Sequence, residues 1–95
     1  MVFQVTVYTE DDGSITLSMD DMDLAVNAPS KEAAIKALCR DMVEYAKEYR
    51  KAFAMYSAAP NRAAHAPLVK EILAATPQEL RDALVFHPEQ MRPNH

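Results

Sequence analysis

A stripe of apolar side chains at helical spacing runs through the middle of the chain. Its members recur every three or four residues, the period of one face of an α-helix; they are Ile35, Leu38, Met42, Tyr45, Tyr49, Phe53 and Tyr56. Ser30 follows Pro29 as a suitable N-cap, so we predict one long helix over residues 30–57. At 1.5 Å per residue this helix is about 40 Å long, whereas a strand of five or six residues spans only about 20 Å. The helix therefore needs more apolar cover than a small sheet provides.

Two alternating runs before this helix predict a β-hairpin. Apolar and polar residues alternate over residues 3–8 and again over residues 15–19, with the sequence Asp12-Gly13 between them. Asp-Gly at such a place favours a tight turn because glycine accepts positive φ. A short third strand is expected at residues 24–26, so residues 1–28 predict an antiparallel sheet of three strands.

Residues 61–86 predict two short helices after the long one. Pro67 suits the first position of one helix. Thr76 and Glu79 have the spacing of a capping box at the start of the other, which is expected to run through Leu84. These helices are expected to cover the end of the long helix.

The predicted architecture is a single α+β domain over residues 1–87. Three antiparallel strands pack on one long helix, and two short helices follow. Its parts are an acidic sheet over 1–28, the long helix over 30–57, the short helices over 61–86, and a flexible tail over 88–95.

Charge is segregated along the chain. Of a net charge of −4, residues 1–30 carry six acidic side chains and no Lys or Arg, and residues 31–95 hold all ten basic residues. The acidic residues are Glu10, Asp11, Asp12, Asp20, Asp21 and Asp23. Such a segment attracts a basic partner and repels phosphates, so we expect no direct binding of nucleic acid by this chain alone. Acidic residues in turns also serve solubility, which is the alternative interpretation.

Several classes of function lack their sequence signals. One glycine, Gly13, cannot build a phosphate-binding loop, and neither the aspartates nor the three histidines have a metal-binding spacing. We expect no metal, no cofactor and no enzymatic activity. No run approaches the roughly 18 apolar residues of a membrane span, and the first residues lack the layout of a signal peptide. A cytoplasmic location without membrane contact is expected.

The segment between the long helix and the next one allows two functional hypotheses and a structural one. Asn61, Arg62 and His65 lie between helices and could form an anion site or the acid–base pair of a small enzyme. The structural alternative is that Asn61 caps a helical turn, Arg62 is solvated and His65 hydrogen bonds to the long helix.

The aromatic end of the apolar stripe predicts an interface between copies of the chain. Tyrosine combines apolar area with a polar tip and therefore suits such an interface. The predicted interface residues of a small homo-oligomer are Tyr45, Tyr49, Phe53 and Tyr56.

The order of predicted elements over residues 3–50 resembles the HicB-type antitoxin family. The shared features are the Asp11-Asp12-Gly13 turn between strands and a helix start in which Ser30 is the cap, followed by Glu32 and Ala33. The resemblance implies a partial RNase H-like domain that neutralises a basic ribonuclease toxin. The acidic sheet residues would then be the toxin contacts, because they can occupy the surface that grips RNA.

Overall fold

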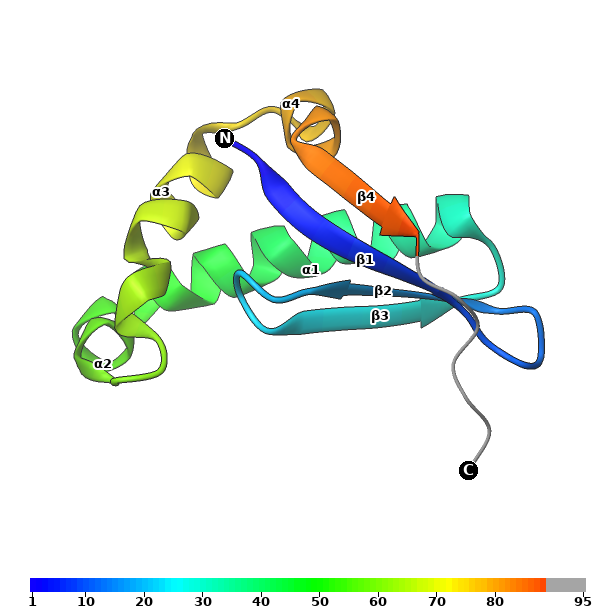
Figure 1. Cartoon of the computed structure of the whole chain (residues 1–95). Coiled ribbons are helices and arrows are strands. Elements are labelled where there is room, and N and C mark those ends of the chain that lie inside the picture. The colour runs from blue at the N-terminus through cyan, green and yellow to red at the C-terminus, as the bar shows by residue number, and fades with distance from the viewer. Residues whose placement is uncertain (89–95) are drawn as a thin grey trace.

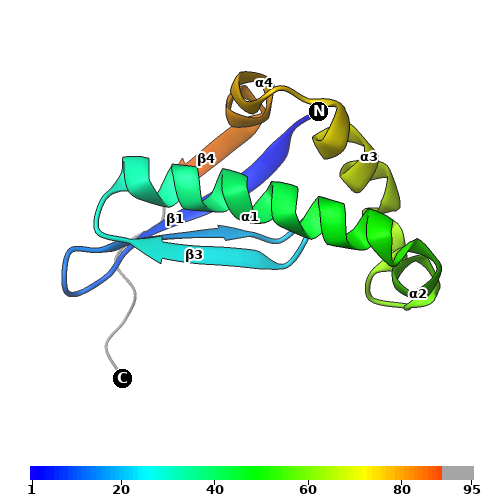
Figure 2. The same ribbon diagram turned by 180° about the vertical axis from the view of Figure 1, so that it is seen from behind.

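The computed structural model describes residues 1–88, which form a four-stranded sheet with a long helix across one face (Figure 1). The strand order is β3-β2-β1-β4. Seen from behind, α1 crosses the sheet diagonally, and α3 and α2 lie at its far end (Figure 2). Within residues 1–88 no helix covers the opposite face of the sheet.

The first three strands form the antiparallel meander that the alternating runs predict. They are β1 (Phe3–Thr9), β2 (Ile15–Met19) and β3 (Leu24–Ala28). Val5 pairs with Met19 and Leu17 with Val26, so the apolar residues of neighbouring strands share the face that α1 covers.

A fourth strand corrects the prediction of a purely antiparallel, three-stranded sheet. β4 (Leu84–Pro88) pairs in parallel with β1, with Phe3 opposite Leu84. Leu84 continues the spacing from Leu80 and so predicts helix, but a short apolar run is ambiguous between helix and strand. Pro88 belongs to β4, and the rest of the predicted tail, residues 89–95, lies outside the described residues.

The long helix is divided in two, which corrects the prediction of one helix over 30–57. α1 (Lys31–Lys51) begins where expected, with Ser30 Oγ accepting a hydrogen bond from the Ala33 N–H at 3.2 Å. It ends at Ala52, which has φ −116° and ψ 42°, and α2 (Phe53–Ala58) follows in a new direction. No proline or glycine marks this break, and the rings of Tyr49 and Tyr56 stack across it.

The remaining helices are short and lead the chain back to the sheet. A 3₁₀ turn, η1 (Ala63–His65), runs into α3 (Ala66–Ala74), and α4 (Pro77–Asp82) precedes β4. The capping box is confirmed: the Glu79 N–H donates to Thr76 Oγ1 at 3.1 Å, and the Thr76 N–H donates to Glu79 Oε1 at 2.9 Å. The helical prediction for 61–86 is therefore right as far as Asp82 and wrong from Leu84.

One hydrophobic core lies between α1 and the sheet. The sheet side chains that are fully buried there are Phe3, Val5, Leu17 and Met19, and those of α1 are Ala34, Leu38, Met42, Ala46 and Tyr49. Val69 and Ile72 from α3 and Leu80 from α4 extend the core past the end of the sheet. The two short helices thus supply the extra cover that the length of the helix requires.

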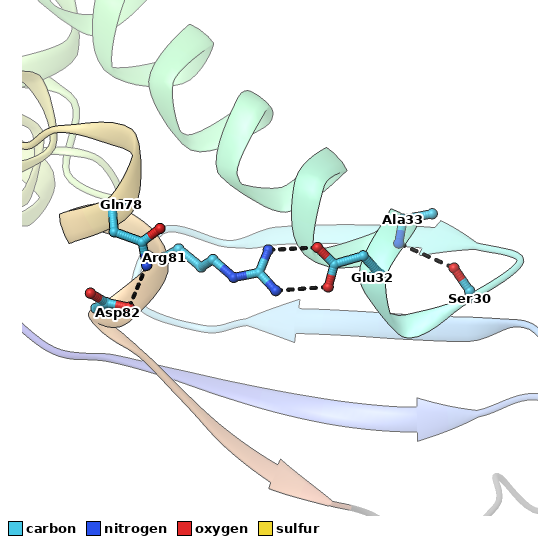
Figure 3. A network of polar contacts seen from close by, with 6 residues as sticks. All are labelled: Ser30, Glu32, Ala33, Gln78, Arg81 and Asp82. Carbon is cyan, nitrogen blue, oxygen red and sulfur yellow. Dashed lines mark hydrogen bonds and ion pairs between the residues drawn. The ribbon is translucent and has the colours of Figure 1, made fainter.

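A bidentate ion pair joins the start of α1 to α4, just before β4. Arg81 donates to both carboxylate oxygens of Glu32, at 2.8 and 2.7 Å (Figure 3). These contacts hold the pKa of Glu32 below its ordinary value. They link two segments that are distant in sequence and so help to position the last strand.

Substitution of Gly13 tests whether the hairpin turn requires a residue with positive φ. Its φ is +86° and a Cβ built there meets nothing within 4 Å, so the Gly13→Ala variant is strained only through its backbone. We expect a loss of about 1 to 2 kcal/mol in the free energy of unfolding, measured by urea denaturation. Gly13→Asn should lose less, because asparagine tolerates positive φ; equal losses would contradict the backbone explanation.

The Glu32–Arg81 pair makes stability depend on pH in a defined direction. A folded-state pKa below the unfolded value means that the stabilisation is present above the ordinary glutamate pKa of about 4.3 and is lost as the pH falls through the lowered value. The urea midpoint of the natural chain should exceed that of Glu32→Gln at neutral pH, and the two midpoints should converge in acid. A constant difference at every pH would show that charge is not the cause.

Candidate functional site

The acidic residues of the β1–β2 turn partly stabilise the turn itself. Asp12 Oδ1 accepts hydrogen bonds from the Ser14 N–H at 2.9 Å and from Ser14 Oγ at 2.6 Å, which lowers the pKa of this carboxyl. Thr16 Oγ1 donates to Glu10 Oε2 at 2.5 Å. Asp11 is exposed at the tip of the turn. Two of the three carboxylates therefore have a structural role in addition to their charge.

The turn between β2 and β3 presents three carboxylates around a buried anchor. Met22 is only 2% exposed and packs into the core, while Asp20, Asp21 and Asp23 on either side of it are exposed. Asp23 has φ 59°, which aspartate tolerates better than most residues. Asp21 Oδ2 accepts the Gln4 N–H at 3.2 Å. Burial of Met22 thus fixes the turn, and its neighbours point outward.

The two acidic turns lie at opposite ends of the sheet rather than in one cluster (Figure 1). β2 separates them and has five residues, which corresponds to about 17 Å. The predicted acidic surface is therefore an elongated one, bounded by a turn at each end. A partner that contacts both turns must extend along the strands.

Within residues 1–88 no cation forms an ion pair with the β2–β3 turn. Among residues 1–88 there are ion pairs between Glu32 and Arg81 and between Arg40 and Asp41, and neither involves Asp20, Asp21 or Asp23. The strands β1 to β3 and their turns contain no Lys or Arg, whereas α1 alone carries Lys31, Lys36, Arg40, Lys47, Arg50 and Lys51. The fold converts a segregation along the sequence into an acidic sheet layer and a helical layer in which cations and carboxylates are mixed.

The tyrosines of the apolar stripe form a cluster within the chain. The rings of Tyr49 and Tyr56 stack with centroids 5.4 Å apart, and the Arg62 guanidinium lies 5.4 Å from the Tyr45 ring and 5.3 Å from the Tyr56 ring. Tyr45 Oη and His65 Nδ1 are hydrogen bonded at 2.6 Å. Tyr49 Oη donates to the Arg62 carbonyl oxygen at 3.0 Å. The loop after α2 thus closes over the end of α1.

This cluster revises the two hypotheses for its residues. Tyr49 is fully buried within the chain and Phe53 is 55% exposed, so the four predicted interface residues differ in how far they reach the surface. Arg62 stacks on tyrosine rings instead of being solvated, and His65 bonds to α1 as the structural alternative expects. Asn61 does not cap the following turn, which starts after Arg62 without a side-chain cap.

The helical layer also has a groove between α1, α2 and α3 that the sequence patterns did not indicate. Its cations are Arg50 and Lys70. Phe53 is an exposed member of the apolar stripe. Helical spacing alone does not distinguish the buried members of the stripe from the exposed ones. Burial depends on where the chain turns after Ala52.

Two kinds of site are absent from the described part of the chain. Within residues 1–88 no three His, Cys, Asp or Glu side chains lie together in a way that would hold a metal ion. No helix in that range is both long and apolar enough to cross a bilayer.

Comparison with known proteins relates this architecture to antitoxins. A family model described as antitoxin of toxin–antitoxin, RelE/RelB (PHD-like), matches residues 1–85. The crystal structure of an antitoxin part of a proposed toxin–antitoxin system from Syntrophomonas wolfei subsp. wolfei is similar, with a TM-score of 0.84 and 28% sequence identity. The similarity covers 94% of this chain and 64% of that protein, so the chain spans less than two thirds of its relative. A search of curated proteins gives no match.

These comparisons confirm one part of the resemblance seen in residues 3–50. The antitoxin class is the same, but the matching family is described as RelE/RelB and PHD-like, so the HicB assignment is not shown. A hairpin followed by a capped helix is common to many folds and could not distinguish antitoxin families.

The buried hydroxyl of Tyr49 tests whether the aromatic cluster holds the loop on α1. Tyr49→Phe removes one hydrogen bond to the Arg62 carbonyl oxygen, which still accepts the His65 N–H. We expect a loss of about 1 kcal/mol in the free energy of unfolding, measured by thermal and urea denaturation. Tyr56→Phe is the matched control and should lose less, because its hydroxyl bonds to the exposed Glu48 carboxylate. A greater loss in the control would contradict this assignment.

Proposed function

Since the family match spans residues 1–85, the chain belongs to the PHD-like family of antitoxins of RelE/RelB toxin–antitoxin systems, and we propose that it neutralises a basic ribonuclease toxin through its acidic sheet turns. The family is one of antitoxins and not of enzymes, so a catalytic role for Asn61, Arg62 and His65 is set aside. The proposed toxin contacts are Glu10, Asp11, Asp12, Asp20, Asp21 and Asp23.

This proposal rests on one observation: the first thirty residues contain no Lys or Arg. These residues form strands β1 to β3, their turns and the segment that leads to α1. The carboxylates of Asp20, Asp21 and Asp23 are exposed and belong to no ion pair within residues 1–88. A cationic partner can therefore approach them without displacing an existing pair, and the field of the sheet layer is not cancelled locally.

Charge complementarity also explains how binding and inhibition can coincide. A toxin that cleaves RNA needs a basic surface to hold phosphates. An acidic protein attracted to the same surface associates faster and excludes the substrate at the same time. The two turns lie at the two ends of the strands. This arrangement suits a partner whose RNA-binding surface has cations spread along a groove.

The β2–β3 turn provides the sharpest test. The double variant Asp20→Lys/Asp23→Asn removes two negative charges and adds one positive charge, and asparagine at position 23 tolerates the φ of 59°. With the co-purified toxin of the same system, we expect the association rate at low salt to fall by about tenfold or more and to lose most of its salt dependence. The rate is measured by surface plasmon resonance at low and at physiological salt.

A charge-matched control is available on the helical layer. Glu44→Lys/Glu71→Gln changes the net charge equally at two exposed positions of α1 and α3. It should leave the association rate close to that of the natural chain. Equal effects of the two double variants would mean that only net charge matters, and the acidic turns would then not be the docking site.

A further inference from the structure

An apolar groove of about 440 Å³ lies between the end of α1, α2 and α3. Tyr49 and Phe53 form one wall, and Val69 and Leu73 of α3 form the other. Figure 2 shows α3 running beside the last turns of α1, with α2 at the end of the pair. The groove is on the helical layer and is separate from the acidic turns of the sheet.

A large apolar side chain of this groove is exposed: Phe53 lines it and is 55% exposed. Met55 of the same short helix is 63% exposed but does not line the groove. These are among the few large apolar side chains exposed within residues 1–88, the others being Met1, Val2 and Val85. An exposed aromatic side chain in an apolar groove is typical of an interaction surface.

The charge around the groove selects the kind of partner. Arg50 and Lys70 line it, no acidic residue does, and neither cation takes part in an ion pair within residues 1–88. A second copy related by a two-fold axis through the groove would bring these cations against their own equivalents. The repulsion disfavours such self-association, whereas a partner with carboxylates beside its apolar residues meets complementary charge.

We infer that this groove binds an amphipathic helix of a partner protein that carries acidic residues beside its apolar anchors. Anchors at positions i, i+3 or i+4 and i+7 enter between Phe53 and Leu73, and the flanking carboxylates pair with Arg50 and Lys70. This docking surface has the opposite charge to the proposed toxin contacts. The chain would thus bind two chemically different surfaces with its two layers.

A pair of synthetic peptides tests the inference on the full chain. One fluorescein-labelled helical peptide has leucines at i, i+3, i+4 and i+7 with flanking glutamates, and the other has lysines in place of the glutamates. Fluorescence anisotropy should show the acidic peptide binding at least about tenfold more tightly than the basic one. Phe53→Ala should weaken this binding, and circular dichroism verifies that the exposed substitution leaves the fold intact.

Charge reversal in the groove provides the decisive comparison. Arg50→Glu/Lys70→Glu should abolish binding of the acidic peptide, whereas the matched double variant Lys36→Glu/Lys47→Glu on α1 should retain it. The Asp20→Lys/Asp23→Asn variant should also retain it, so failure of this inference is distinguishable from failure of the proposed toxin contacts.

Three results would overturn the inference. The first is binding of neither peptide, and the second is binding that Phe53→Ala or Arg50→Glu/Lys70→Glu leaves unchanged. The third is a dimer in analytical ultracentrifugation that Phe53→Ala converts to a monomer, since the groove would then be occupied by a second copy.

Discussion

Packing of α1 on one face of the sheet is the interaction on which the rest of the structure depends. The buried residues of β1 and β2 meet those of α1 over the length of the strands, but α1 has 21 residues and continues beyond them. The segments from Ala52 to the end of α3 cover that excess: α2 turns back, the loop at Arg62 closes over the tyrosines, and α3 lies against the remaining apolar face. The groove beside Phe53 is where this cover ends.

Local sequence signals predicted the parts of the fold that local interactions determine. The Asp-Gly hairpin, the cap at Ser30 and the capping box at Thr76 all depend on residues within four positions of one another, and all three are present. The break at Ala52 could not be predicted in this way. In a straight helix Tyr49 and Tyr56 would be about 10.5 Å apart along the axis, whereas their rings stack at 5.4 Å. The break brings these rings together and lets Arg62 pack on Tyr56, and such contacts cannot be read from local helix signals.

Local signals likewise predicted the chemical character of the candidate residues but not their positions in the fold. The acidic turns were recognisable because charge and exposure can be read from composition, but their placement at opposite ends of the sheet required the register of the strands. The tyrosine stripe was recognisable as apolar, but which ring is buried depends on Arg62 and on α3. β4 was missed because Val85 and Phe86 form too short a run to outweigh helical spacing from Leu80.

The parallel pairing of β4 with β1 has a consequence for the way the chain acquires its structure. Phe3 is synthesised well before Leu84, so the edge of β1 that pairs with β4 stays open while the residues between them leave the ribosome. The hairpin and α1 can form from near neighbours, but the closing strand must bridge nearly the whole sequence, which is entropically slow. During that interval β1 has unpaired backbone groups and can accept a strand from another molecule. A nascent antitoxin of this shape is therefore most vulnerable to misassembly just before β4 pairs with β1.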